Sequence, residues 1–379
     1  MGWVHKVRQQ SGRAGWQARW RDPAGVERAK NFARRADAER YLVSLESDKL
    51  RGRYADPRLG RTRLADWLTE WQSTRTNLSP ATRLRDEASI RNHVISNLGR
   101  VAIGQIQPVH VAQWVAALDA AGLAPATTRK AYQLLSAALN AAVDNGLIAL
   151  SPCRNVKLPR LQKPDMRILE PREIEKLAGS IDERYRAMVL TAAASGLRFG
   201  ELAALKTERF DALRRSLRVE ASLSEVRGEF IFKAPKSEAS RRTVSVPGFL
   251  VEELAQHLAR FGDVSGLLFS APEGGPIRRN NFRRRIWEPS VESSVGKPCT
   301  FHDLRHSHAA LLIAQGEHPK VIQERLGHAS IKTTLDTYGH LFDGLDEAAA
   351  DRFDATWRAS RADAMLIRRD SAVIQLVTQ

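Results

Sequence analysis

The sequence predicts a multidomain α+β protein: a small β-β-β-α domain, a helical domain, and a mainly helical C-terminal domain that holds a small antiparallel sheet. The 379 residues are more than one hydrophobic core usually organises. Apolar residues alternate with polar ones near the N-terminus, as in strands, whereas most of the chain has helical periodicity. We expect domains at residues 1–61, 62–152 and 168–379, with residues 153–167 as a linker.

The N-terminal domain carries the clearest strand signals. Three strands and one helix are expected at Trp3–Arg8, Trp16–Trp20, Glu27–Phe32 and Ala36–Leu50. The segment Asp22-Pro-Ala-Gly25 is typical of a turn between the second and third strands.

Positive charge is concentrated in this domain. The chain has a net charge of +16, and residues 1–61 hold 15 Lys and Arg against 7 Asp and Glu, which is half of that net charge. Such an excess favours a polyanionic partner, with nucleic acid as the first candidate. Trp16 and Trp20 share one face of their strand and are expected in the core. Arg19 and Arg21 then point away from the core, and we predict that they bind DNA.

The cysteine and apolar content argue against two protein classes. Cys153 and Cys299 are the only cysteines and form no C-x-x-C pair, so neither a disulfide framework nor a cysteine zinc site is expected. The chain begins without an apolar signal segment, and no stretch approaches the length of a membrane span. We therefore expect a cytoplasmic protein that has no membrane partner.

The second domain is predicted to contain four helices. They are expected at Leu64–Trp71, from Ser79 as N-cap with Pro80 at the first position, at Val109–Leu118 and at Thr127–Val143. Residues 153–167 then contain two prolines, and five Lys and Arg against one Asp. This composition is typical of an extended linker that runs close to phosphates.

The C-terminal domain should alternate helices with a short β region. Helices are expected at Pro171–Ala178, Glu183–Ser195 and Phe249–Phe261, strands at Ser216–Ala221, Phe230–Lys233 and Arg242–Val246, and helices again in the last third.

Five polar residues of this domain suit phosphodiester chemistry without a metal. They follow one another as Arg198, His302, Arg305, His328 and Tyr338. Arginines offer fork-shaped donors to phosphate oxygens, histidines move protons near neutral pH, and a phenol can become a covalent nucleophile.

Local spacing places some of these groups together. Glu201 lies one helical turn from Arg198 and is expected to hold its guanidinium. His302 and Arg305, three residues apart at the start of a helix, can present both side chains to an anion where the helix dipole favours one.

A zinc site is the competing interpretation of this helix. His302-Asp-x-x-His306 imitates the H-E-x-x-H zinc motif. The acid is one carbon shorter, Arg305 lies inside the motif and no third ligand is evident, so no metal is expected. We interpret His306 and His308 as structural residues.

The order and spacing of these residues, over roughly residues 165–345, resemble the tyrosine recombinase (phage integrase) family. The basic N-terminal domain resembles the arm-binding domain of lambda-type integrases. By this resemblance, Tyr338 attacks a phosphate of duplex DNA and forms a 3′-phosphotyrosine. Arg198 and Arg305 neutralise the charge that develops on the phosphate.

The resemblance also implies roles for residues around the reacting phosphate. Lys236 matches a hairpin lysine that protonates the leaving oxygen, and Arg241 and Arg242 become contacts to the DNA backbone. His302 is implied in proton transfer, and His328 as a hydrogen-bond donor to the phosphate.

The implied function is integration and excision of a phage or mobile element without a cofactor. The implied partners are double-stranded DNA at core and arm sites, three further copies in a homotetramer, a host DNA-bending protein and a directionality factor. The second domain becomes the core-binding domain, and the apolar tail Ala372–Val377 could dock on a neighbouring copy. The protein is expected at the nucleoid of a bacterial host.

Three alternatives remain. A non-catalytic DNA-binding protein would account for the charge but leave the ordered site residues unused. A type IB topoisomerase shares the chemistry, although the basic N-terminal domain favours an enzyme that binds two kinds of site. A chromosome-dimer-resolving recombinase usually lacks such a domain.

Overall fold

The computed structural model describes residues 2–8, 14–22, 25–50, 54–56, 58–161, 166–233, 241–262, 265–342, 346–347 and 349–361. The chain forms two compact units, Met1–Lys163 and Pro164–Gln379. No helix within these described ranges is long and apolar enough to cross a membrane. Lys236 and the tail Ala372–Val377 lie outside the described residues.

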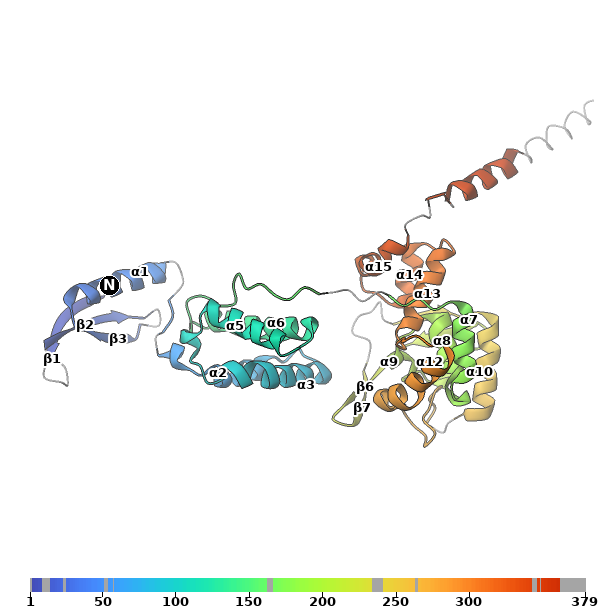
Figure 1. Cartoon of the computed structure of the whole chain (residues 1–379), viewed down its shortest axis with the longest axis horizontal. Coiled ribbons are helices and arrows are strands. Elements are labelled where there is room, and N and C mark those ends of the chain that lie inside the picture. The colour runs from blue at the N-terminus through green and yellow to red at the C-terminus, as the bar shows by residue number, and fades with distance from the viewer. Residues whose placement is uncertain are drawn as a thin grey trace, which may run out of the picture. The chain divides into compact units, whose positions relative to one another are not determined.

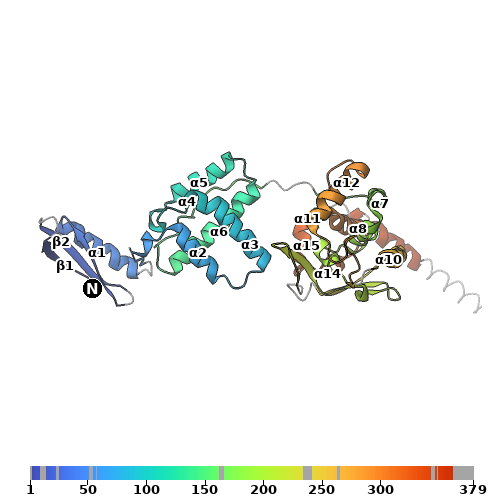
Figure 2. The same cartoon turned by 90° about the horizontal axis from the view of Figure 1, so that it is seen from below.

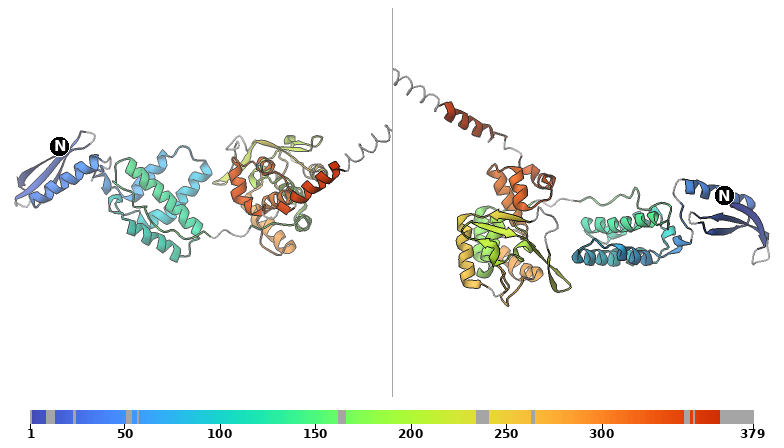
Figure 3. Two further views of the ribbon diagram at one scale, coloured as in Figure 1. Left: turned by 90° about the horizontal axis from the view of Figure 1, so that it is seen from above. Right: turned by 180° about the vertical axis from the view of Figure 1, so that it is seen from behind.

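The first unit begins with a three-stranded antiparallel sheet in the order β1-β2-β3. Its strands are β1 (Trp3–Arg8), β2 (Ala14–Arg21) and β3 (Glu27–Phe32), and helix α1 (Arg35–Leu50) covers one face (Figures 1 and 3). Ala18 and Trp20 of the sheet pack with Leu42 of the helix in a small core. The predicted β-β-β-α order is confirmed.

The opposite face of the sheet carries Arg19 and Arg21, as their alternation with Trp20 predicts. Arg21 is exposed. Arg19 donates from Nη1 to Glu27 at 2.8 Å and from Nε to the Gln17 side chain at 2.7 Å. Arg19 is therefore held in a fixed orientation on the surface of the sheet.

A helical bundle follows (Figure 2). Its helices are α2 (Leu64–Thr74), α3 (Pro80–Ser89), α4 (Ser96–Leu98), α5 (Pro108–Ala120) and α6 (Pro125–Asp144). The Ser79 side chain accepts from the Thr82 amide and caps α3. A π-helical stretch, Ile90–Ile95, carries α3 directly into α4, so the second predicted helix is longer than its start signal alone indicated.

Two segments join the parts of this unit. Asp56 donates its amide to Gly146 at 3.0 Å and pairs with Arg28 of β3 at 2.8 Å, so residues 54–56 connect the sheet to the end of α6. Residues 153–159, predicted as part of an extended linker, lie against α6, since the Cys153 carbonyl accepts from Tyr132 and the Pro159 carbonyl from Arg129.

The second unit surrounds α8 with helices and two small sheets. Its helices are α7 (Pro171–Ser180), α8 (Glu183–Ser195), α9 (Phe199–Leu202), α10 (Gly248–Phe261), α11 (Arg279–Phe282), α12 (Glu288–Ser294), α13 (Asp303–Ala314), α14 (Pro319–Leu326) and α15 (Ile331–Tyr338). One sheet has the order β4-β5-β8, from Phe210–Asp211, Ser216–Val219 and Arg242–Ser245, and a separate hairpin pairs β6 (Ser222–Val226) with β7 (Glu229–Lys233).

Buried side chains of α8, among them Met188 and Leu190, form the centre of the main core. Gly196 ends α8 in the left-handed conformation, at φ +67°. A Cβ atom at Gly196 would lie 2.7 Å from the His308 ring and 2.7 Å from Leu326, so only glycine fits there. This close approach brings Arg198, two residues later, beside α13 and α14.

Candidate active site

Arg198 is the exposed arginine of the site. It precedes α9, donates its backbone amide to Glu201 Oε2 at 2.9 Å, and donates from Nη1 to Glu201 Oε1 at 3.0 Å. Its side chain keeps 39% of its exposure, so a phosphate can reach the guanidinium. The predicted support of Arg198 by Glu201 is present in the structure.

Arg242 requires a correction, because it was predicted to contact the DNA backbone. Its side chain is only 7% exposed and lies at 3.0 Å from Glu201, which is itself 6% exposed. Arg242 also donates from Nε to the Arg325 carbonyl at 2.6 Å. Burial opposes the ionisation of Glu201, yet hydrogen bonds from Arg242 and Arg198 outweigh it and lower the pKa of the carboxyl group. Arg242 therefore positions the site from inside the protein.

Replacing Arg242 with glutamine should leave the Glu201 carboxylate buried without its main partner. We expect a loss of about 3 to 5 kcal/mol in the free energy of unfolding, the usual cost of breaking a buried ion pair. Urea unfolding of the full chain, followed by circular dichroism, measures this loss. Arg241→Gln is the matched control, since Arg241 is the exposed neighbour and should change stability little. Equal stability of the two variants would contradict the positioning role of Arg242.

Arg305 lies at the centre of the site and is 2% exposed. It donates from Nη1 to the Gly196 carbonyl at 2.6 Å and from Nη2 to the Leu326 carbonyl at 2.7 Å and His328 Nε2 at 2.9 Å. A guanidinium has five N–H groups. The other two N–H groups, one on Nε and one on Nη1, have no hydrogen-bond acceptor among the described residues. Burial lowers the pKa of Arg305 to about 9, so it stays charged at neutral pH.

His328 supports Arg305 instead of offering a free N–H group. Arginine can only donate, so His328 Nε2 must accept, and the ring proton then sits on Nδ1, which lies 2.9 Å from Thr334 Oγ1. Burial, and then the nearby Arg305, lower the pKa of His328 to about 4 and keep it neutral. The expected donation from His328 to the phosphate is not available in this arrangement, and the residue orients Arg305 instead.

His302 is the N-cap of α13 and is exposed. Its ring contacts that of His306 edge-on, with centroids 4.7 Å apart. Partial burial of the ring, followed by the charges of His306 and Arg305, lowers the pKa of His302 to about 4. His302 therefore borders the site in its neutral form.

Tyr338, the last residue of α15, is 1% exposed and packs among Ala309, Ile322 and Leu326. Its hydroxyl lies 2.9 Å from His306 Nδ1. Burial raises the pKa of Tyr338, whereas Arg305 and Arg198 act in the opposite direction. The phenol and both arginines therefore belong to one electrostatic cluster.

The structure adds His306 and Thr334 to the residues found in the sequence. His306 was interpreted as structural, and that interpretation missed its contact with Tyr338; its place one turn after His302 was the available signal. Thr334 gave no signal at all. His308 is buried and hydrogen-bonded to the Ala193 carbonyl, away from the Tyr338 hydroxyl.

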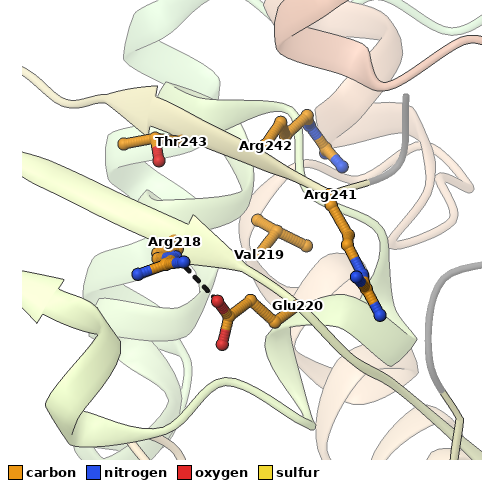
Figure 4. Close-up of a pocket in the computed structure, with 6 residues that line it drawn as sticks. All are labelled: Arg218, Val219, Glu220, Arg241, Arg242 and Thr243. Atoms are coloured by element: carbon orange, nitrogen blue, oxygen red, sulfur yellow. Dashed lines mark ion pairs between the residues drawn. The ribbon is translucent and has the colours of Figure 1, made fainter. Parts of the chain in front are cut away.

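A polar cavity of about 630 Å³ lies at the paired ends of β5 and β8 (Figure 4). It is lined by Arg218, Val219, Glu220, Arg241, Arg242 and Thr243. Residues 234–240, which include Lys236, directly precede Arg241 in the sequence and lie outside the described residues. In the described part of the chain, no group of three His, Cys, Asp or Glu side chains is arranged to hold a metal ion.

Two integrases are similar in sequence to most of this chain. The ICEBs1 integrase of Bacillus subtilis is 29% identical over 336 residues, which cover 84% of this chain and 90% of the relative. The integrase of Mycobacterium phage D29 is 27% identical over 352 residues, which cover 88% and 92%.

Solved structures share the fold. The Tn1549 transposon integrase in complex with a circular intermediate DNA aligns with a TM-score of 0.68 at 21% identity, over 77% of this chain and 99% of that one. A lambda integrase tetramer bound to a Holliday junction aligns with a TM-score of 0.57 at 19% identity, over 86% and 95%.

Two protein-family models match the chain in the expected order. The phage integrase N-terminal SAM-like domain matches residues 63–118, and the phage integrase family matches residues 167–344, which contain every candidate catalytic residue. Together these matches cover more than half of the chain. The chain belongs to the phage integrase family of tyrosine recombinases.

Proposed function

We propose that the chain integrates and excises a phage or mobile element by cutting and rejoining duplex DNA through a 3′-phosphotyrosine at Tyr338. The observation that carries this proposal is that Tyr338 packs in one small core with Leu326, whose carbonyl accepts a hydrogen bond from Arg305. A phenol beside two guanidinium groups is suited to attack a phosphate that those groups bind.

The arginines have different tasks in this proposal. Arg198 binds the non-bridging phosphate oxygens with its exposed guanidinium, and Arg305 supplies the two N–H groups that its protein partners leave over. Each well-placed donor lowers the barrier by about 3 kcal/mol. Glu201 and His328 keep the two guanidinium groups in position, since each contacts one of them directly.

Lys236 protonates the leaving 5′ oxygen in this proposal. Its position in the sequence, between β7 and β8, supports that role together with the family resemblance. Arg241 is exposed beside the same cavity and suits a contact to the DNA backbone. The phosphotyrosine retains the energy of the phosphodiester, so rejoining requires no nucleotide.

Tyr338 is 1% exposed in the protein without DNA. The phosphorus atom of a bound DNA strand cannot reach a buried hydroxyl oxygen. Some of the side chains that bury Tyr338 must therefore move when DNA binds.

We infer duplex DNA and three further copies of the chain as partners. The solved relatives include an integrase with a circular intermediate DNA and an integrase tetramer on a Holliday junction. Exchange between two duplexes cuts four strands, which requires four nucleophiles. We also propose that a host DNA-bending protein and a directionality factor act with the chain, and that it is located at the bacterial nucleoid.

Sequencing of recombinant junctions tests this function. Purified protein is incubated with DNA fragments that flank its own gene, in EDTA and without nucleotide, and we expect junctions between two defined sites. Relaxation of supercoils without junctions would indicate a topoisomerase, and DNA binding without covalent adducts would indicate a non-catalytic protein. Junctions that disappear in EDTA and return with zinc would revive the metal site at His302 and His306.

Removing the N-terminal sheet should separate arm binding from core cleavage. A cut after residue 53 is preferable to one after residue 61, because residues 54–56 hydrogen-bond to the helical bundle. Residues 1–53 hold 13 Lys and Arg against 6 Asp and Glu. The truncated protein should cleave a minimal core site, fail to join complete sites, and bind DNA with a weaker salt dependence. Recombination of complete sites at the full-length rate would contradict arm binding.

A further inference from the structure

His306 is the one described residue that hydrogen-bonds to the reacting oxygen of Tyr338, with Nδ1 at 2.9 Å. Its ring also faces the Tyr338 ring, with centroids 5.7 Å apart and planes at 64°. His306 lies on α13 and Tyr338 at the end of α15. These helices and α14 share a small core that is separate from the main core of the unit. The two residues are therefore held by helices that pack on one another.

The direction of this hydrogen bond follows from what each group needs. Tyr338 is buried, and within the described ranges His306 is the one hydrogen-bond partner of its hydroxyl. If His306 donated, the phenol hydrogen would remain unpaired in a buried place, which is unfavourable. A neutral imidazole with a bare Nδ1 accepts that hydrogen and leaves nothing unpaired.

Burial is the main reason that His306 is neutral before the reaction. Burial lowers the pKa of His306, and Arg305 lowers it further, whereas Asp303 raises it. The remaining titratable groups that face the ring are His302, edge-on, and Tyr338. A neutral imidazole can take up a proton, and Asp303 favours the imidazolium that results.

His302, the residue expected to transfer protons, is not placed to take the proton of Tyr338. It occupies the exposed N-cap position of α13, and its ring contacts that of His306. His306 stands between His302 and Tyr338.

We propose that His306 Nδ1 accepts the proton of the Tyr338 hydroxyl as the phenol attacks DNA, an inference that rests on the proposed function. The Oη–H bond of Tyr338 breaks while the Oη–P bond forms, and the proton passes to His306, which becomes an imidazolium. The bond from phosphorus to the 5′ oxygen breaks, and that oxygen takes its proton from a different donor. In rejoining, the 5′ hydroxyl attacks phosphorus and gives its proton back to that donor, the bond from phosphorus to Oη breaks, and His306 returns its proton to the phenolate.

The test measures how fast the protein becomes covalently attached to a nicked suicide substrate in a single turnover. His306→Asn keeps a hydrogen-bonding group near the position of Nδ1 but cannot take up a proton. We expect it to slow attachment by about 10² to 10⁴-fold, the usual contribution of a general base. With 3,5-difluorotyrosine at position 338, whose phenol is more acidic, most of that deficit should disappear. Because burial lowers the pKa of His306, the wild-type rate should fall only as the pH drops below about 6.5, the usual imidazole pKa, and H306N should lose that dependence.

Two further variants keep the test decisive. His306→Gln is measured in parallel in case asparagine disturbs the fold, and thermal unfolding verifies both. His318→Asn is the matched control: His318 caps α14 outside the site, and asparagine also caps helices well, so its rate should equal that of the wild type. An H306N deficit that is the same with tyrosine and difluorotyrosine would overturn the proposal, because His306 would then only hold the tyrosine. A wild-type protein that never attaches to DNA would overturn the proposed function itself.

Discussion

Replacing Tyr338 with phenylalanine should abolish covalent attachment to DNA while DNA binding persists. The substitution removes one oxygen atom, the proposed nucleophile, and leaves the ring in its small core among α13, α14 and α15. The expected loss is complete because no other described tyrosine shares the arginine cluster. A nicked suicide substrate measures attachment, and fluorescence anisotropy measures binding to the same DNA.

Tyr185→Phe is the matched control for this prediction. Tyr185 is also buried in the second unit, but it packs in the main core with its ring 5.2 Å from that of Phe282. Its rate of attachment should stay close to that of the wild type. A covalent adduct in Tyr338→Phe would remove Tyr338 as the nucleophile.

Replacing Lys236 with alanine should slow cleavage by about 10² to 10⁴-fold, the range for a lost proton donor. The defect should depend on the leaving atom. If sulfur replaces the bridging 5′ oxygen at the scissile phosphate, the leaving group needs no proton, and Lys236→Ala should then cleave almost as fast as the wild type.

Arg198→Ala provides the contrast on the same two substrates. Arg198 is proposed to stabilise charge on the non-bridging oxygens, which sulfur at the bridging position does not replace, so no rescue is expected. If Lys236→Ala is equally slow on oxygen and sulfur substrates, Lys236 is a phosphate or groove contact and not the acid.

Local signals predicted much of the fold. Alternation around Trp16 and Trp20 gave β2, and Ser79 followed by Pro80 gave the start of α3, because both depend on neighbouring residues only. The strand β6, Ser222–Val226, was missed because three of its five residues are polar. The attachment of residues 54–56 to Gly146 joins segments about ninety positions apart, and no local pattern indicates such a contact.

In the candidate site, too, local sequence predicted some features, whereas contacts between distant segments could not be predicted. Order and spacing alone indicated Arg198, Arg305 and Tyr338, and the structure places them in one cluster. The burial of Arg242 against Glu201 and the contact of His306 with Tyr338 could not be predicted, because each depends on how distant elements pack. The local sequence around Arg242 would be the same whether its side chain faced solvent or the site. The same is true of His306.

Identification of the residue that is joined to DNA tests the central claim most directly. The wild-type protein is trapped on a nicked suicide substrate, digested with nuclease and protease, and the peptide that keeps a 3′-nucleotide is sequenced by mass spectrometry. The proposed mechanism predicts that the nucleotide is attached through phosphate to the oxygen of Tyr338. Attachment to any other residue, or strand cleavage without a covalent adduct, would contradict it.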